Sequence, residues 1–142
     1  MSQADSGALN NIMKKLLGIV VLGLLLSGNA YAEWSYVETI SRADDNNKIK
    51  IYIDPETFKK DENYSYIWKL EDLTIPFKDI KSTAFHHQID CKLTRSKTLQ
   101  YIFYTGQMGT GMPKPFVRDT IKWTSYPPSS YMSNLIKGIC NS

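Results

Sequence analysis

The strongest constraint on the fold of this chain is an alternation of apolar and polar residues that recurs in six segments. In residues 48–54, Ile49, Ile51 and Ile53 alternate with lysines and a tyrosine. Successive side chains of a β-strand point to opposite faces, so this period of two predicts a strand with one buried face. The polar turn at residues 42–47 makes it the second strand of an antiparallel hairpin. The other predicted strands cover residues 34–40, 64–73, 82–91, 98–105 and 116–123.

Prolines and glycines predict where these strands end. Pro55 ends the second strand, because proline has no N–H to donate to a neighbouring strand. Pro76 makes residues 75–81 a linker without regular pairing. Residues 106–115 hold three glycines and two prolines, which is typical of a flexible hairpin loop.

Two central strands show how side chains divide between the faces of the predicted sheet. The third strand has an aromatic-rich face with Tyr64, Tyr66, Trp68 and Leu70. Its polar face holds Ser65, Lys69 and Glu71, with Ile67 as an exception. In the fourth strand His86 and His87 are neighbours and point to opposite faces. We expect His87 to pack beside the core and His86 to be exposed.

The period of the pattern changes after Trp123. Pro127 and Pro128 end the sheet, and a serine that follows them can cap a helix. The apolar stripe of this predicted helix consists of Met132, Leu135, Ile136, Ile139 and Cys140. The sequence therefore predicts an α+β fold, an antiparallel sheet of about six strands with one C-terminal helix packed on it.

The first 32 residues predict export from a bacterial cytoplasm. Two lysines after Met13 precede an apolar run at residues 16–26, and Ala30 and Ala32 fit a cleavage site after Ala32. A membrane anchor is the alternative, but 11 apolar residues fall short of the roughly 20 that a spanning helix needs. We expect residues 1–32 to be an N-terminal extension plus signal peptide, with translation starting at Met13, and residues 33–142 to be the mature domain. Asn29 stands where a lipoprotein has its lipid-bearing cysteine, so we expect a periplasmic or secreted protein without a stable membrane anchor.

Cys91 and Cys140 are the only cysteines, and both lie in the predicted mature domain. An isolated pair in an oxidising compartment is most simply a disulfide. A redox-active pair is the alternative, although such cysteines are usually close in sequence. Because Cys91 lies on the apolar face of the fourth strand and Cys140 on the helix stripe, the bond would tether the helix to the sheet.

The sequence contains no motif that predicts an enzyme, a metal site or a cofactor site. Neighbouring histidines on a strand cannot bind one ion together, and the glycines at 106–111 precede a strand instead of the helix of a phosphate loop. No serine lies in a Gly-x-Ser-x-Gly motif. The 17 basic and 14 acidic residues are scattered, which excludes nucleic acid as an expected partner. A hydrolase with an unrecognised site remains a weaker alternative.

Phe77, Lys78 and Lys81 are the candidate partner-binding residues. They combine an aromatic ring with two positive charges in the predicted linker, and exposed apolar residues of this kind often mark interfaces. The alternative is that Phe77 and Ile80 pack under the sheet edge. A homodimer through an exposed edge strand is a further option.

Several short segments in a fixed order resemble the surface-adhesin protein E-like family. They are Trp34, residues 51–54, residues 68–72, Ser82 nine residues before Cys91, Tyr104 with Gly109 and Gly111, Trp123 before Pro128 and Ser130, and Leu135 before Cys140. The resemblance implies a small exported bacterial domain that binds host matrix proteins. We therefore expect an exported non-enzymatic binding protein whose partner is a host matrix or envelope protein. The alternative is a periplasmic small-ligand carrier that uses the groove between sheet and helix, with Tyr and Trp side chains in its lining.

Overall fold

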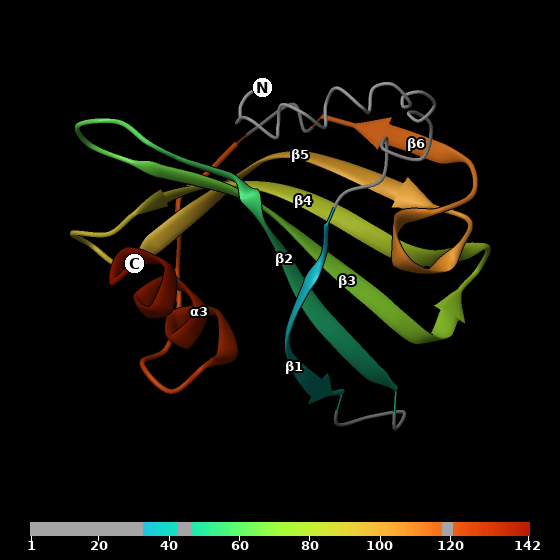
Figure 1. Cartoon of the computed structure of the whole chain (residues 1–142). Coiled ribbons are helices and arrows are strands. Elements are labelled where there is room, and N and C mark those ends of the chain that lie inside the picture. Colours follow the sequence, from blue (N-terminus) through green and yellow to red (C-terminus); the bar gives the residue numbers. More distant parts are fainter. Residues whose placement is uncertain (1–32, 43–46, 118–120) are drawn as a thin grey trace, which may run out of the picture. The chain divides into compact units, whose positions relative to one another are not determined.

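Strands that follow one another in the chain pair side by side in an antiparallel sheet. The structure, a computed structural model, describes residues 33–42, 47–117 and 121–142, so the predicted signal peptide lies outside the described residues. The sheet consists of β1 (Ser35–Ser41), β2 (Lys48–Lys60), β3 (Ser65–Phe77), β4 (Ile80–Asp90), β5 (Arg95–Tyr104) and β6 (Pro113–Phe116), in this order, and β7 (Thr124–Ser125) pairs with β5 (Figure 1). One helix, α3 (Tyr131–Cys140), follows the sheet. The predicted α+β fold is confirmed.

Two prolines that were predicted to end strands lie inside irregular stretches of longer ones. β2 continues past Pro55 because its register with β3 shifts between Asp54 and Lys59. In this bulge the Thr57 hydroxyl accepts a hydrogen bond from the Trp68 N–H (3.0 Å) in place of a strand carbonyl. β3 likewise continues past Pro76, and Phe77 pairs with Ile80 after a second register shift. The predicted linker at 75–81 is therefore a hairpin, because bulges absorb the prolines.

The position predicted for the sixth strand is wrong. β6 covers Pro113–Phe116 and pairs with Tyr101–Tyr104 of β5, whereas residues 121–123 are not in a strand. Both prolines of β6 are tolerated because it is an edge strand with one unpaired side.

The glycine-rich segment before β6 is anchored to the sheet and does not form the expected flexible loop. Its 3₁₀ turn, η2 (Gln107–Gly109), is held by Ser82, whose hydroxyl donates to the Gly106 carbonyl (2.7 Å) and accepts from the Gly109 N–H (2.9 Å). Asp72 accepts from the Met108 N–H at 2.7 Å. Gly109 has a φ of 71°, which disfavours other residues there.

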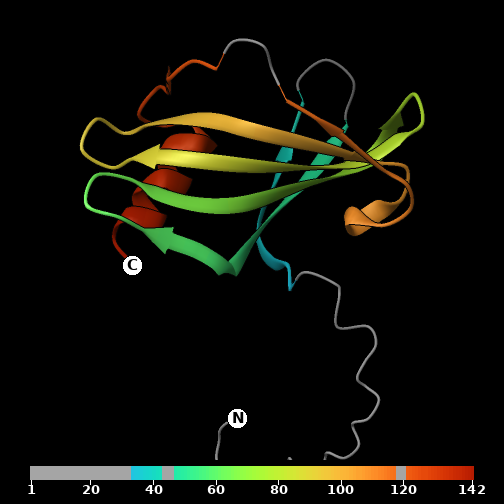
Figure 2. The ribbon, with the colours of Figure 1, turned by 90° about the horizontal axis from the view of Figure 1, so that it is seen from above.

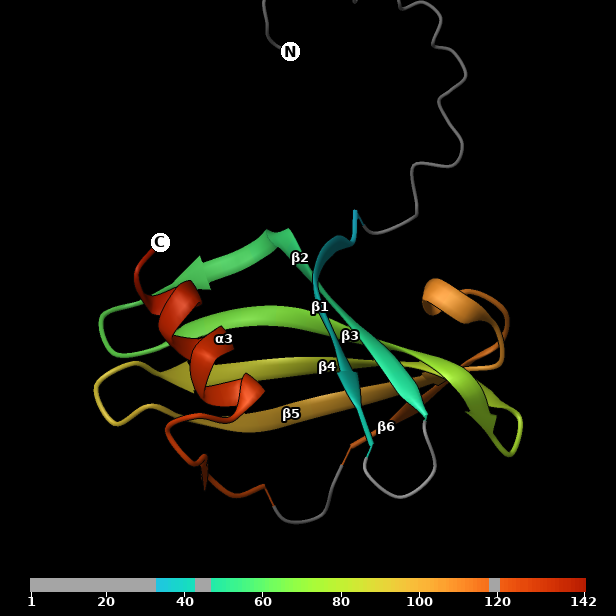
Figure 3. The same ribbon diagram turned by 90° about the horizontal axis from the view of Figure 1, so that it is seen from below.

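α3 packs on one face of the sheet, in front of the strands in Figure 3 and behind them in Figure 2. The Ser130 hydroxyl caps it by accepting from the Ser133 N–H at 3.2 Å. The packed core joins Ile67 and Ile89 of the sheet to Met132, Ile136 and Ile139 of the helix. At the end of α3, Cys140 forms the predicted disulfide with Cys91, with a Cα–Cα distance of 5.7 Å.

The helix covers the row of β3 side chains that the sequence pattern indicated as polar. Ser65, Ile67 and Lys69 are all buried there, because α3 and its neighbours supply polar partners as well as apolar contacts. Trp68 points to the opposite face, where its ring stacks on His86 with centroids 4.8 Å apart. This stacking leaves His86 half-buried and corrects the expectation that it is exposed, whereas His87 is buried as predicted.

Candidate functional site

The three predicted partner-binding residues lie at the tip of the β3–β4 hairpin. Phe77 is 64% exposed, so it does not pack under the sheet edge, while Ile80 is half-buried. Lys78 and Lys81 are exposed, and the Lys78 ammonium lies 5.6 Å from the centroid of the Phe77 ring. We call Ile75, Phe77, Lys78 and Lys81 the hairpin-tip surface.

An ion pair ties this hairpin to the edge strand β6, on the far side of β5. Asp79, next to Lys78, accepts a hydrogen bond from the Lys114 ammonium of β6 at 2.9 Å. This interaction holds the pKa of Asp79 below its ordinary value. The hairpin-tip surface and α3 lie at opposite ends of the strands in Figures 2 and 3. A change at one end can therefore be tested without disturbing the other.

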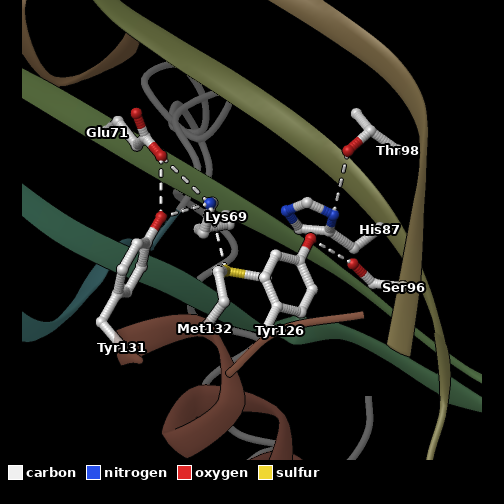
Figure 4. Close-up of polar contacts among 8 residues, drawn as sticks. All are labelled: Lys69, Glu71, His87, Ser96, Thr98, Tyr126, Tyr131 and Met132. Atoms are coloured by element: carbon white, nitrogen blue, oxygen red, sulfur yellow. Dashed lines mark hydrogen bonds and ion pairs between the residues drawn. The ribbon is translucent and has the colours of Figure 1, made fainter. Parts of the chain in front are cut away.

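A second candidate site lies where the first turn of α3 meets β3 and β4 (Figure 4). Its centre is Lys69, whose ammonium donates to Glu71 Oε2 (3.0 Å), to the Tyr131 hydroxyl (2.9 Å) and to Met132 Sδ (3.5 Å). Tyr131 in turn donates to Glu71 Oε2 at 3.0 Å. Burial lowers the pKa of Lys69 and, together with Glu71, raises that of Tyr131. The ammonium is thus desolvated but paired.

His87 lies on the same face of the sheet as Lys69. Its Nδ1 shares a hydrogen bond with the Thr98 hydroxyl (3.3 Å), whereas its buried Nε2 has no hydrogen-bond partner among the described residues. Burial, and secondly the charge of Lys69, hold the pKa of His87 well below 6.5. The ring is therefore neutral at physiological pH.

These groups line a pocket of about 330 Å³. Its lining consists of Lys69, Phe85, His87, Thr98, Tyr126, Ser130, Tyr131 and Met132. A second, more apolar pocket of about 270 Å³ lies between β1, β2 and the other side of α3. Tyrosines line the groove between sheet and helix as expected, but no tryptophan does in either pocket. Trp68 lies on the opposite face.

Sequence reasoning missed Lys69, Glu71 and Tyr131 because it described this row of β3 only as a polar face and predicted no partner for it. The signal that could have found them was Ile67, an isoleucine in the middle of that row. Isoleucine is among the residue types most often buried, so Ile67 suggests a covering element over this part of the strand.

Residues 33–42, 47–117 and 121–142 contain neither a metal-binding cluster nor a helix that could cross a membrane. This part of the chain holds no group of three or more His, Cys, Asp or Glu side chains that could bind a metal ion. No helix within it is long and apolar enough to span a membrane.

Solved structures of protein E from Haemophilus influenzae have a similar fold. One of them superposes with a TM-score of 0.57 at 17% sequence identity, covering 73% of this chain and 86% of that one. A second crystal form gives 0.55 at 18% identity, covering 72% and 87%. Protein E from a non-typeable strain gives 0.52 at 16% identity, covering 77% and 86%. No curated protein sequence matches this chain.

The sequence model of one protein family, described as surface-adhesin protein E, matches residues 34–141. The match spans the whole sheet, the helix and both cysteines. It confirms the resemblance that the sequence motifs indicated. This chain belongs to the surface-adhesin protein E family.

Proposed function

We propose that residues 33–142 form an exported, non-enzymatic binding module that recognises a host matrix or envelope protein through the hairpin-tip surface. The observation that carries this proposal is Phe77, an aromatic side chain held 64% exposed at a hairpin tip. Two positive charges, Lys78 and Lys81, flank it. Exposed aromatic rings are costly to leave in water and are enriched at protein interfaces.

Family membership supports the proposal at a coarser level. It makes this chain an adhesin-like protein that is exported or located at the cell surface. The partner and the surface that binds it are our inference from the exposed residues. The positive charges favour a partner with an acidic patch, since complementary charges speed association. Added salt should weaken this attraction.

Binding to immobilised vitronectin and laminin tests this function. We expect saturable binding that Phe77→Ser weakens at least tenfold and that rising salt weakens further. The matched control is Leu93→Ser, because Leu93 is similarly exposed (59%) but lies in the turn between β4 and β5. Equal effects of the two substitutions would show that the hairpin-tip surface is not the contact. If neither matrix protein binds saturably, the proposal that the partner is a host matrix protein is refuted. A pull-down from the cell envelope then tests whether the partner is an envelope protein.

Export is part of the same proposal. We infer that residues 13–32 are a cleavable signal peptide, and that Asn29 leaves the mature protein without a lipid. The expected result is a periplasmic or secreted protein whose mass corresponds to residues 33–142 with one disulfide. A protein that retains the apolar run at 16–26 would contradict cleavage.

A second candidate function is a small-ligand carrier that uses the groove between sheet and helix. The observation that favours it is the pair of pockets beside α3. The pocket of about 330 Å³ is at the lower end of the roughly 300–1,000 Å³ of small-molecule sites, and the pocket of about 270 Å³ is just below that range. Native mass spectrometry of protein purified without denaturant tests it. A bound molecule that is lost on unfolding supports a carrier, and a ligand-free mass after incubation with periplasmic extract opposes it.

A further inference from the structure

A buried imidazole nitrogen without a partner marks the pocket of about 330 Å³ as more than a packing defect. His87 is 4% exposed, and no described residue makes a hydrogen bond to its Nε2. A buried polar group that is left unpaired costs about 1–3 kcal/mol. In Figure 4 this nitrogen lies on the side of the ring that faces Lys69. The imidazole Nε2 of His87 is therefore available to a ligand that lies beside the buried ammonium of Lys69.

The ammonium of Lys69 also has capacity for a ligand. Two of its hydrogen bonds go to strong oxygen acceptors, Glu71 and Tyr131, at 3.0 and 2.9 Å. The third goes to the thioether of Met132 at 3.5 Å, and thioether sulfur is a weak acceptor. Methionine is also flexible and can move aside. A carboxylate oxygen would therefore be a better partner than sulfur for the third donor.

The charge and shape of the pocket favour an anion that carries an aromatic ring. Ser130, Tyr131 and Met132 are the cap and first turn of the ten-residue helix α3, whose N-terminal end is the positive end of its dipole. The rings of Phe85 and Tyr126 belong to the same lining. The N-terminus of α3, the Lys69 ammonium and the two aromatic rings of the lining fit a small, flat acid.

We propose that this pocket binds the carboxylate of a small aromatic acid between Lys69 and His87. The proposal rests on the second candidate function, the small-ligand carrier, and gives it a ligand class. One carboxylate oxygen takes the N–H that Lys69 now directs to Met132, and the other meets His87 Nε2. Because a protonated imidazole donates from both nitrogens, a bound anion favours the uptake of a proton by His87.

Several charged or titratable groups surround His87 and set this coupling. Burial lowers its pKa most, Lys69 on β3 and His86 on β4 lower it further, and the backbone of Lys97 on β5 raises it. Tyr126 and Tyr131 line the same pocket, and Tyr131 is hydrogen-bonded to Glu71. A carboxylate beside His87 adds a negative charge that opposes Lys69. Affinity should therefore rise as the pH falls from 7.5 to 5.5, by at most about tenfold per pH unit.

Benzoate is a suitable probe, and its neutral isostere benzamide is the matched control. We expect benzoate to shift the imidazole ¹⁵N signals of His87 saturably in the disulfide-intact protein. The signals of His86, which lines a separate pocket on the opposite face, should not move. Benzamide should bind at least tenfold more weakly, and Lys69→Met should weaken benzoate at least tenfold.

Several outcomes would overturn the proposal. They are the absence of any His87 shift, equal binding of benzoate and benzamide, and an affinity that does not change with pH. Should Lys69→Met fail to fold, the benzamide comparison on the unmodified protein decides the question alone. Matrix-protein binding is measured separately at the hairpin-tip surface, so a failure there leaves the benzoate result unaffected. A carrier with a different ligand would still show a bound molecule in native mass spectrometry while benzoate fails.

Discussion

Replacing Lys69 with methionine tests whether the buried ammonium stabilises the fold or is a cost to it. The Lys69 side chain is 4% exposed, and burial lowers its pKa. Lys69→Met keeps an unbranched side chain that is shorter only by the ammonium nitrogen, and it leaves the hydrogen bond from Tyr131 to Glu71 in place. Exchanging a whole buried ion pair for apolar groups is often neutral or stabilising, whereas removing one member is costly only to the extent that the other charge stays buried. Since Glu71 is 21% exposed and can be hydrated, we expect a gain in unfolding free energy of about 0–2 kcal/mol.

Removing the other partner should have the opposite effect. Glu71→Ala leaves the ammonium buried without its counter-charge, which typically costs 3–5 kcal/mol. We expect a loss of about 3 kcal/mol, at the low end, because Tyr131 still accepts from Lys69. In the background of Lys69→Met, the same substitution should cost less than about 1 kcal/mol, since the two residues are coupled.

Urea unfolding with the disulfide intact measures these free energies. Because the pKa of Lys69 is lowered in the folded state, folded protein loses this proton before the unfolded chain does as the pH rises. The cost of Glu71→Ala should therefore be largest at low pH and shrink as the pH rises through the folded pKa of Lys69. A loss of more than about 2 kcal/mol in Lys69→Met, or no loss in Glu71→Ala, would refute the view that desolvation dominates here.

Three other predictions follow from buried or cross-linked groups. Since the pKa of His87 is held well below 6.5, the unfolded chain takes up a proton first as the pH falls. The free energy of unfolding should therefore drop below pH 6.5 by up to about 1.4 kcal/mol per pH unit. His87→Phe should reduce this pH dependence in urea titrations, and an unchanged dependence would be inconsistent with a neutral buried ring. Replacing both Cys91 and Cys140 with alanine removes a link across 49 residues and should lower the free energy of unfolding by about 4 kcal/mol. An unchanged unfolding midpoint would contradict this prediction. Ser82→Ala removes both hydrogen bonds to η2 and should cost about 2 kcal/mol with faster exchange of the Gly109 amide, whereas unchanged exchange would show that other contacts hold the turn.

The sequence alone predicted the elements with a clear period and the link between them. Ile49 and Ile51 are buried and their alternation was sufficient to place β2, because a strand with one buried face needs no other information. The stripe of Met132, Ile136 and Ile139 did the same for α3. Cys140 lies on α3 and Cys91 directly follows β4, and their disulfide was predicted because they are the only two cysteines of a domain predicted to be exported.

Features that depend on contacts across the chain could not be predicted. The bulge at Pro55 exists because Thr57 replaces a strand carbonyl, and the polar row of β3 is buried because Tyr131 approaches from 62 residues away. The partners of these contacts, Trp68 for Thr57 and Tyr131 for Lys69, lie 11 and 62 residues away in the chain, so local composition does not reveal them. For the same reason the hairpin tip was recognised as a candidate surface from Phe77 and its lysines, whereas the groove between sheet and helix was anticipated without the roles of Lys69 and His87.

The pairing of each strand with its neighbour in the chain has a consequence for the order of assembly. Consecutive strands are joined by short loops, so β1 to β6 can pair one after another through contacts between residues close in sequence. Such contacts generally form fast. The helix is the exception, since its contacts with β3 and β4 join the last residues of the chain to its middle. Until α3 arrives, Lys69 and Ile67 remain open to water on an unfinished surface. We expect the docking of α3 to be the late step in folding, and Lys69→Met should therefore slow unfolding more than it speeds folding.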